Sequence, residues 1–100
     1  MRLLGFKGDK NCRCVQINYV GLDDPKDLSE WIKLVFDQQV TGEQGADWWI
    51  WPVQWGEFWF LRYCELTATL WFELQGRAGY DSAAAELCAQ LSQFVKDSHD

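Results

Sequence analysis

The sequence predicts an α+β fold, a two-layer sandwich in which two helices cover one face of an antiparallel or mixed sheet of about five strands. Three observations predict it. A length of 100 residues is typical of one domain, so we expect a single domain over residues 1–100. Several stretches with alternating apolar residues are typical of strands. Two stretches with apolar residues three and four positions apart are typical of amphipathic helices, and the expected order is ββαβββα.

Residues 2–7 and 12–20 are the first two expected strands. Val15, Ile17 and Tyr19 alternate with polar residues, which is typical of a strand with one buried face. Residues 8–11 between them, Gly-Asp-Lys-Asn, favour a turn. The pattern therefore predicts an N-terminal hairpin.

The first helix is expected over residues 25–38. Asp24 suits the N-cap, because its carboxylate can accept the free backbone N–H groups of the first turn. Pro25 suits the first helical position, where no N–H is needed. The apolar stripe at helical spacing comprises Leu28, Trp31, Ile32 and Val35.

Three more strands are expected at residues 47–54, 58–63 and 68–74, after a loop over residues 40–46. Pro52 has no N–H to donate to a neighbouring strand. The first of these three strands is therefore expected at a sheet edge or with a bulge.

The second helix follows a loop over residues 75–79, and Asp81 or Ser82 is expected to cap it. Lys96 is expected in its last turn, and residues 98–100 are expected to fray. Its apolar stripe comprises Ala84, Leu87, Cys88, Leu91, Phe94 and Val95.

The charge of the chain disfavours some partners. A formal net charge of −6 and a pI near 4.6 oppose binding to nucleic acid or to an anionic membrane, because both carry phosphates. No stretch approaches the roughly 20 apolar residues of a membrane helix, and residues 1–9 do not have the pattern of a secretory signal. We therefore expect a cytoplasmic protein whose four cysteines stay reduced.

The titratable residues do not form a recognisable catalytic pattern. The only histidine, His99, lies near the C-terminal residue, where a Ser-His-Asp or Cys-His arrangement is not expected. The alternative is a small ligand-binding domain or enzyme that uses Glu57, Glu65, Glu73 or Cys14, but the pattern does not single out one carboxyl group with a raised pKa. We expect no catalytic residue and a protein that is not an enzyme.

Cys12 and Cys14 are the closest pair of cysteines in the sequence. Residues two apart on a strand share a face, so both thiols can contact one ion. Their spacing is not the Cys-x-x-Cys of zinc ribbons and redox sites, and a tetrahedral site needs two more ligands. Metal binding is therefore the weaker alternative, and no metal or cofactor is expected.

Aromatic residues are the one feature of the sequence that points to a binding surface. Arg62, Glu73 and Asp47 are charged, so we expect them to mark the face of the sheet that no helix covers. The residues that share this face by alternation form the predicted partner surface: Trp49, Trp51, Phe58, Phe60, Arg62 and Trp71. The alternative is that loops, the N-terminal hairpin or the C-terminal tail cover these rings.

Residues 61–73, LRYCELTATLWFE, together with the Trp-rich strand before them, resemble a family of small uncharacterised gamma-proteobacterial proteins known as a domain of unknown function. The resemblance lies in a strand, a short turn with an acidic residue and a closing strand that ends in Trp71-Phe72-Glu73. Cys64 and Leu66 depart from the more polar turn of the family. The resemblance implies a bacterial cytoplasmic protein and assigns no activity and no functional residue.

Together these observations predict a non-catalytic protein-interaction module. Its aromatic face is expected to bind a protein partner or a second copy of the chain, and no nucleic acid or membrane.

Overall fold

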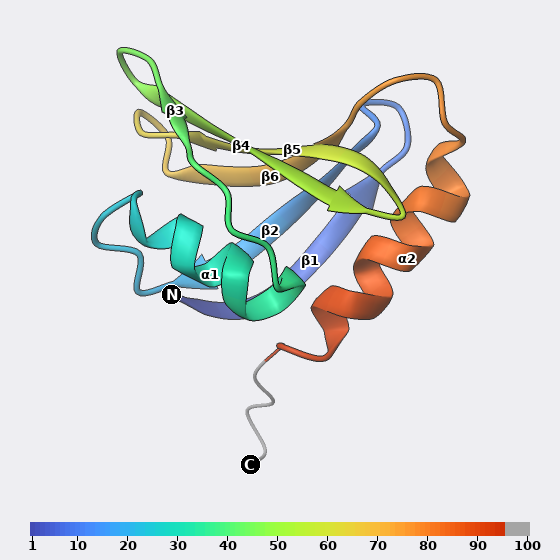
Figure 1. Cartoon of the computed structure of the whole chain (residues 1–100), viewed down its shortest axis with the longest axis horizontal. Coiled ribbons are helices and arrows are strands. Elements are labelled where there is room, and N and C mark those ends of the chain that lie inside the picture. Colours follow the sequence, from blue (N-terminus) through green and yellow to red (C-terminus); the bar gives the residue numbers. More distant parts are fainter. Residues whose placement is uncertain (96–100) are drawn as a thin grey trace.

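The sheet and both helices are visible in a computed structural model, which describes residues 1–95 (Figure 1). The helices lie on one side of a six-stranded sheet. The elements in chain order are β1 (Arg2–Asp9), β2 (Cys14–Val20), α1 (Asp27–Phe36), β3 (Glu43–Gln44), β4 (Trp48–Trp55), β5 (Glu57–Cys64), β6 (Thr69–Leu74) and α2 (Tyr80–Ser92). Neither helix is long and apolar enough to cross a membrane.

The strands follow the order β1-β2-β6-β5-β4-β3, and all neighbours are antiparallel. The predicted α+β class and the layering are confirmed. The predicted number of about five strands and the order ββαβββα are wrong, because β3 makes six strands and the order ββαββββα. β3 lies inside the predicted loop over residues 40–46. It has only two residues, which are too few to produce an alternating pattern.

The first helix is shorter than predicted at both ends. Asp24 does satisfy the first turn, since its carboxylate accepts the N–H of Lys26 at 3.0 Å, but this turn is irregular and the helix begins at Asp27. Asp37 adopts a left-handed conformation with φ of 55° and ends the helix before Gln38. The Gln38 side chain then bonds the backbone of Gln54 on β4.

The second helix begins one residue before the predicted caps. Gly79 occupies the N-cap position, and no side chain caps the helix, so the assignment of Asp81 or Ser82 to the cap is wrong. The hydroxyl of Tyr80 donates to the carbonyl oxygen of Cys14 at 2.8 Å and ties the helix start to β2. Lys96 and the frayed segment predicted at residues 98–100, with His99, lie outside the described residues.

Pro52 lies where the outer side of β4 has no neighbouring strand. β3 pairs only with Trp49 and Ile50, so the strand is an edge beyond those two residues. The missing N–H of Pro52 therefore leaves no gap in a ladder, as the sequence predicts.

The core between sheet and helices is built around aromatic rings. Trp51, Trp59 and Phe72 are fully buried side chains of the sheet. Trp31 and Phe36 of α1 contact Phe72, with ring centres 6.2 and 5.7 Å away. Large rings let a sheet and two short helices bury a core in a chain of this length.

Candidate functional site

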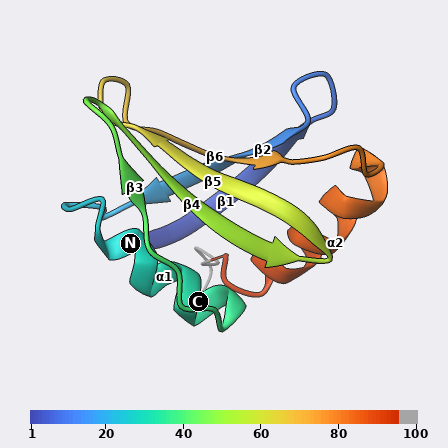
Figure 2. The ribbon, with the colours of Figure 1, turned by 45° about the horizontal axis from the view of Figure 1, so that its top comes forward.

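Within residues 1–95, one face of the sheet has no helix on it (Figure 2). Cross-strand pairs show which side chains share this face, since Pro52 lies opposite Phe60 and Arg62 lies opposite Trp71. Besides Gln54, Cys64 and Thr69, the strands β4, β5 and β6 place there the side chains that we name the aromatic face: Trp48, Ile50, Pro52, Phe58, Phe60, Arg62, Trp71 and Glu73.

The structure places four of the six predicted surface residues together on this face and excludes the other two. Trp49 and Trp51 are 8 % and 0 % exposed and face the helices, so their predicted exposure is wrong. The prediction took Asp47 as the marker of the open face, but β4 begins at Trp48 and Asp47 precedes it. Trp49, Trp51 and Val53 therefore face the helices, and the residues between them face the open side, which is the reverse of the prediction.

Both buried indoles have hydrogen-bond partners on the covered side. Trp49 Nε1 donates to Glu65 Oε1 at 2.7 Å, and Trp51 Nε1 donates to Ser29 Oγ at 2.9 Å. The two rings stack with centres 5.5 Å apart and an interplanar angle of 10°. They therefore belong to the core and are not available to a partner.

Several large rings of the aromatic face are accessible to a partner. Trp48 is 42 % exposed and Phe58 is 39 % exposed, and Phe60 and Trp71 are half-buried. Phe58 and Phe60 pack edge to face with centres 5.4 Å apart. The arrangement is a preformed apolar surface on rigid strands.

Arg62 lies in the middle of the aromatic face. Its guanidinium carbon is 5.8 Å from the centre of the Phe60 ring, within the range of a cation–π contact. Its Nε lies 3.2 Å from Glu73 Oε2, so the two side chains form an ion pair. The contact does not have the geometry of a hydrogen bond from Nε. The charge of Arg62 is therefore balanced within the face.

The charges on this side of the whole sheet also balance. Strand pairing places three cationic and three anionic side chains on it: Arg2, Lys7 and Arg62, and Asp9, Glu43 and Glu73. These six cancel, so the chain's formal net charge of −6 resides on residues outside this face.

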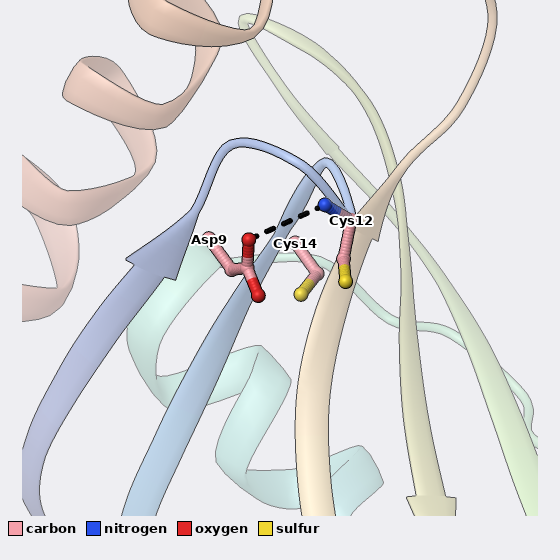
Figure 3. Close-up of side chains that lie close together, drawn as sticks. All are labelled: Asp9, Cys12 and Cys14. Carbon is pink, nitrogen blue, oxygen red and sulfur yellow. Dashed lines mark hydrogen bonds between the residues drawn. The ribbon is translucent and has the colours of Figure 1, made fainter.

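Cys12 and Cys14 lie together with Asp9 at the connection between β1 and β2 (Figure 3). Cys14 is buried and Cys12 is exposed. A hydrogen bond to Asp9, together with its negative charge, raises the pKa of the Cys12 thiol. Burial raises the pKa of Cys14 to about 11, and the neighbouring Cys12 and Asp9 contribute.

Glu57, Glu65 and Glu73 are not brought together. Glu57 begins β5 and Glu65 follows its end, a separation of roughly 26 Å along an extended strand. Glu73 lies opposite Phe60 in the middle of β5. The three carboxyl groups therefore do not form a carboxylate pair.

Sequence reasoning missed Trp48, Ile50 and Pro52 of the aromatic face and Asp9 beside the cysteines. Gln54 was the available signal for β4. It is polar and follows Trp48, Ile50 and Pro52 at every second position, so it marks the side that all four share as exposed. For Asp9 the signal was its position three residues before Cys12 in a turn, where a carboxylate folds back over the chain.

Comparison of this chain with protein families, with curated proteins and with solved structures finds no match. The resemblance of residues 61–73 to a gamma-proteobacterial family therefore stays a prediction.

Proposed function

We propose that this chain is a non-catalytic protein-interaction module whose aromatic face packs against a second copy of itself. The observation that carries the proposal is the uncovered face with Trp48 and Phe58 exposed beside half-buried Phe60 and Trp71. Tryptophan, tyrosine and arginine dominate the energy of protein interfaces, and contiguous exposed apolar surface is typical of interaction sites.

Charge favours a second copy as the occupant. Two molecules of formal net charge −6 repel each other through most of their surface. The open side of the sheet is where the charges cancel, so two copies can approach there with the least repulsion. Stacking of two such sheets, with Arg62 and Glu73 already paired within each copy, leaves no unpaired charge at the centre of the interface.

The proposal includes a reducing compartment such as the bacterial cytoplasm. All four cysteines are free thiols, even though Cys12 and Cys14 are close neighbours. Free thiols are typical of reducing compartments.

Sedimentation equilibrium over a wide concentration range tests the proposal. The chain is expected to form a dimer, and Phe58→Ala and Trp71→Ala are each expected to weaken it roughly tenfold or more, as truncation of an interface anchor does. Leu34→Ala is the matched control, because Leu34 is an exposed apolar residue on α1, on the opposite side of the sheet.

Thermal unfolding of each variant shows whether the fold is kept. A chain that stays monomeric at high concentration overturns the proposal. So does a dimer that Phe58→Ala and Trp71→Ala leave unchanged, because the copies would then meet elsewhere.

A further inference from the structure

We propose that Asp9, Cys12 and Cys14 bind one zinc ion at the turn between β1 and β2. One carboxylate oxygen and the two sulfur atoms all lie within 4.8 Å of one another (Figure 3). The sequence alone supplied two of these ligands, and the fold supplies the third. The three ligands lie on the same open side of the sheet as the aromatic face, since Cys14 pairs with Glu73, but none of its rings is a ligand and zinc binding does not depend on the proposed self-association.

The ligand set fits zinc. Thiolates are preferred ligands of zinc, and a carboxylate is an accepted third ligand in tetrahedral sites. In such a site two ligand atoms are roughly 3.3 to 3.8 Å apart, given metal–ligand distances of about 2.0 to 2.3 Å. The three ligand atoms are at most 4.8 Å apart, so binding requires only small movements of the ligand side chains toward the ion. Three protein ligands leave the fourth position to a water molecule or an external ligand.

Backbone hydrogen bonds hold the Asp9 carboxylate in place through one of its oxygens. Oδ1 accepts the backbone N–H of Asn11 at 3.0 Å and that of Cys12 at 3.4 Å. The second oxygen lies on the side of the two sulfur atoms (Figure 3). Such anchoring of a ligand by further hydrogen bonds is typical of metal sites, because it fixes the direction of the donor atom.

The turn between the two cysteines is fixed by contacts from other parts of the chain. Arg13 adopts a left-handed conformation with φ of 54°. Its guanidinium donates to the carbonyl oxygens of Gly76 and Ala78 at 3.1 and 3.0 Å, and its own carbonyl accepts the N–H of Leu74 at 2.9 Å. The left-handed residue places both thiols beside Asp9, and the three hydrogen bonds of Arg13 hold this geometry before any ion arrives.

Access to the site also fits. Cys14 is buried, so its thiol contributes a ligand in a low-dielectric surrounding, whereas Cys12 is exposed. The exposed thiol gives the ion an entry path from solvent to the buried one.

The experiment uses the full chain, reduced and stripped of metal with a chelator. Zinc is titrated in competition with a chromogenic chelator, which gives the affinity and the stoichiometry. Cobalt(II) is titrated separately, because its thiolate charge-transfer absorption grows with the number of sulfur ligands. We expect one zinc per chain, a cobalt spectrum of two thiolates in tetrahedral geometry, and a higher thermal unfolding temperature with zinc.

Three variants and two controls locate the ion. Cys12→Ser, Cys14→Ser and Asp9→Asn are each expected to weaken zinc binding by about tenfold or more, since changes only to the outer shell of a site already cost about 10 to 100-fold. Asp9→Asn keeps the side-chain oxygen that accepts from Asn11 and removes the carboxylate ligand. Cys64→Ser and Cys88→Ser are expected to bind zinc as the unchanged chain does.

Cys12→Ser and Asp9→Asn change exposed or partly exposed side chains, so both variants are expected to fold even if Cys14→Ser does not. Zinc binding that neither change weakens overturns the site. Stoichiometric binding of copper(I) without binding of zinc overturns the assignment of the metal. Oligomeric state is measured in the same samples, so failure of the zinc site and failure of the aromatic interface are told apart.

Discussion

At the scale of single residues, hydrogen bonds and burial shift the pKa values of the four thiols in different directions. The side chain and backbone of Thr67 lower the pKa of Cys64 through hydrogen bonds. Burial raises the pKa of Cys88, and the pKa values of Cys12 and Cys14 are raised as well. Since the thiolate is the reactive form, the lower pKa makes Cys64 the most nucleophilic cysteine near neutral pH.

We expect iodoacetamide to modify Cys64 first when the metal-free chain is treated at neutral pH. Peptide mass spectrometry at short reaction times measures the order. Thr67→Val removes the largest stabiliser of the Cys64 thiolate, so its alkylation is expected to slow several-fold. Cys88 in the same molecule serves as the internal control, and an equal slowing of both thiols would contradict the assignment.

β4 shows how far a residue pattern can predict which side chains of a strand are buried. Val53 and Trp51 alternate with Pro52 and Gln54, so a regular strand here defines two sets of side chains, although Pro52 can interrupt the alternation. Which set is covered depends on partners elsewhere, here Ser29 for the Trp51 indole. That partner lies 22 residues away, so the local pattern indicates the covered set only through Gln54, the polar residue of the exposed set.

At the scale of elements, the connection from α1 to β4 is fixed by close packing against Trp51. A Cβ atom on Gly42 would lie 2.5 Å from Trp51 Nε1 and 2.6 Å from Cε2. The ring is fully buried, stacked on Trp49 and bonded to Ser29, so it cannot move aside. Only glycine allows the chain to pass over this indole.

Gly42→Ala is therefore expected to lower the free energy of unfolding by about 1 to 3 kcal/mol, the usual cost of overpacking a rigid core. Urea denaturation followed by tryptophan fluorescence measures it. Gly5→Ala is the matched control, because a Cβ on Gly5 meets nothing within 4 Å and the residue has no positive φ. Equal stability of the two variants would show that the Trp51 ring does move aside.

The hairpin, both helices and three of the four later strands follow from periodicity, because each has enough residues to repeat a pattern. β3 could not be found this way. Its two residues, Glu43 and Gln44, are exposed and are strand only because Ile50 and Trp49 pair with them. The helix ends were displaced because Asp37 and Gly79 set them by backbone conformation, which charge and apolar spacing do not encode.

At the scale of the whole molecule, the layering decides which aromatic residues form a surface. Phe58, Phe60 and Trp71 were predicted together because charged Arg62 and Glu73 lie in the same strands and mark the open side. The meeting of Asp9 with Cys12 and Cys14 depends on a turn held by Arg13 across 63 and 65 residues of sequence. Such a contact can be found only in the folded chain.

The distribution of charge gives the proposed dimer an unusual dependence on salt. The contacts are apolar and the charges on the face cancel, so screening removes little attraction. It does remove the repulsion between two chains of formal net charge −6. Between about 0.1 M and about 1 M salt the screening length falls from about 10 Å to about 3 Å.

We therefore expect sodium chloride to tighten the dimer by at least about twofold over this range, as measured by sedimentation equilibrium. Glu57 is exposed at the start of β5, and its pairing with Trp55 places its side chain on the helix side, so it contributes to the net charge outside the aromatic face. Glu57→Gln lowers that charge by one, so it is expected to tighten the dimer slightly at low salt and to leave it unchanged at high salt, where long-range repulsion is screened. A dimer that salt weakens would instead be held by ion pairs between copies, and the acidic surface rather than the aromatic face would then carry the contact.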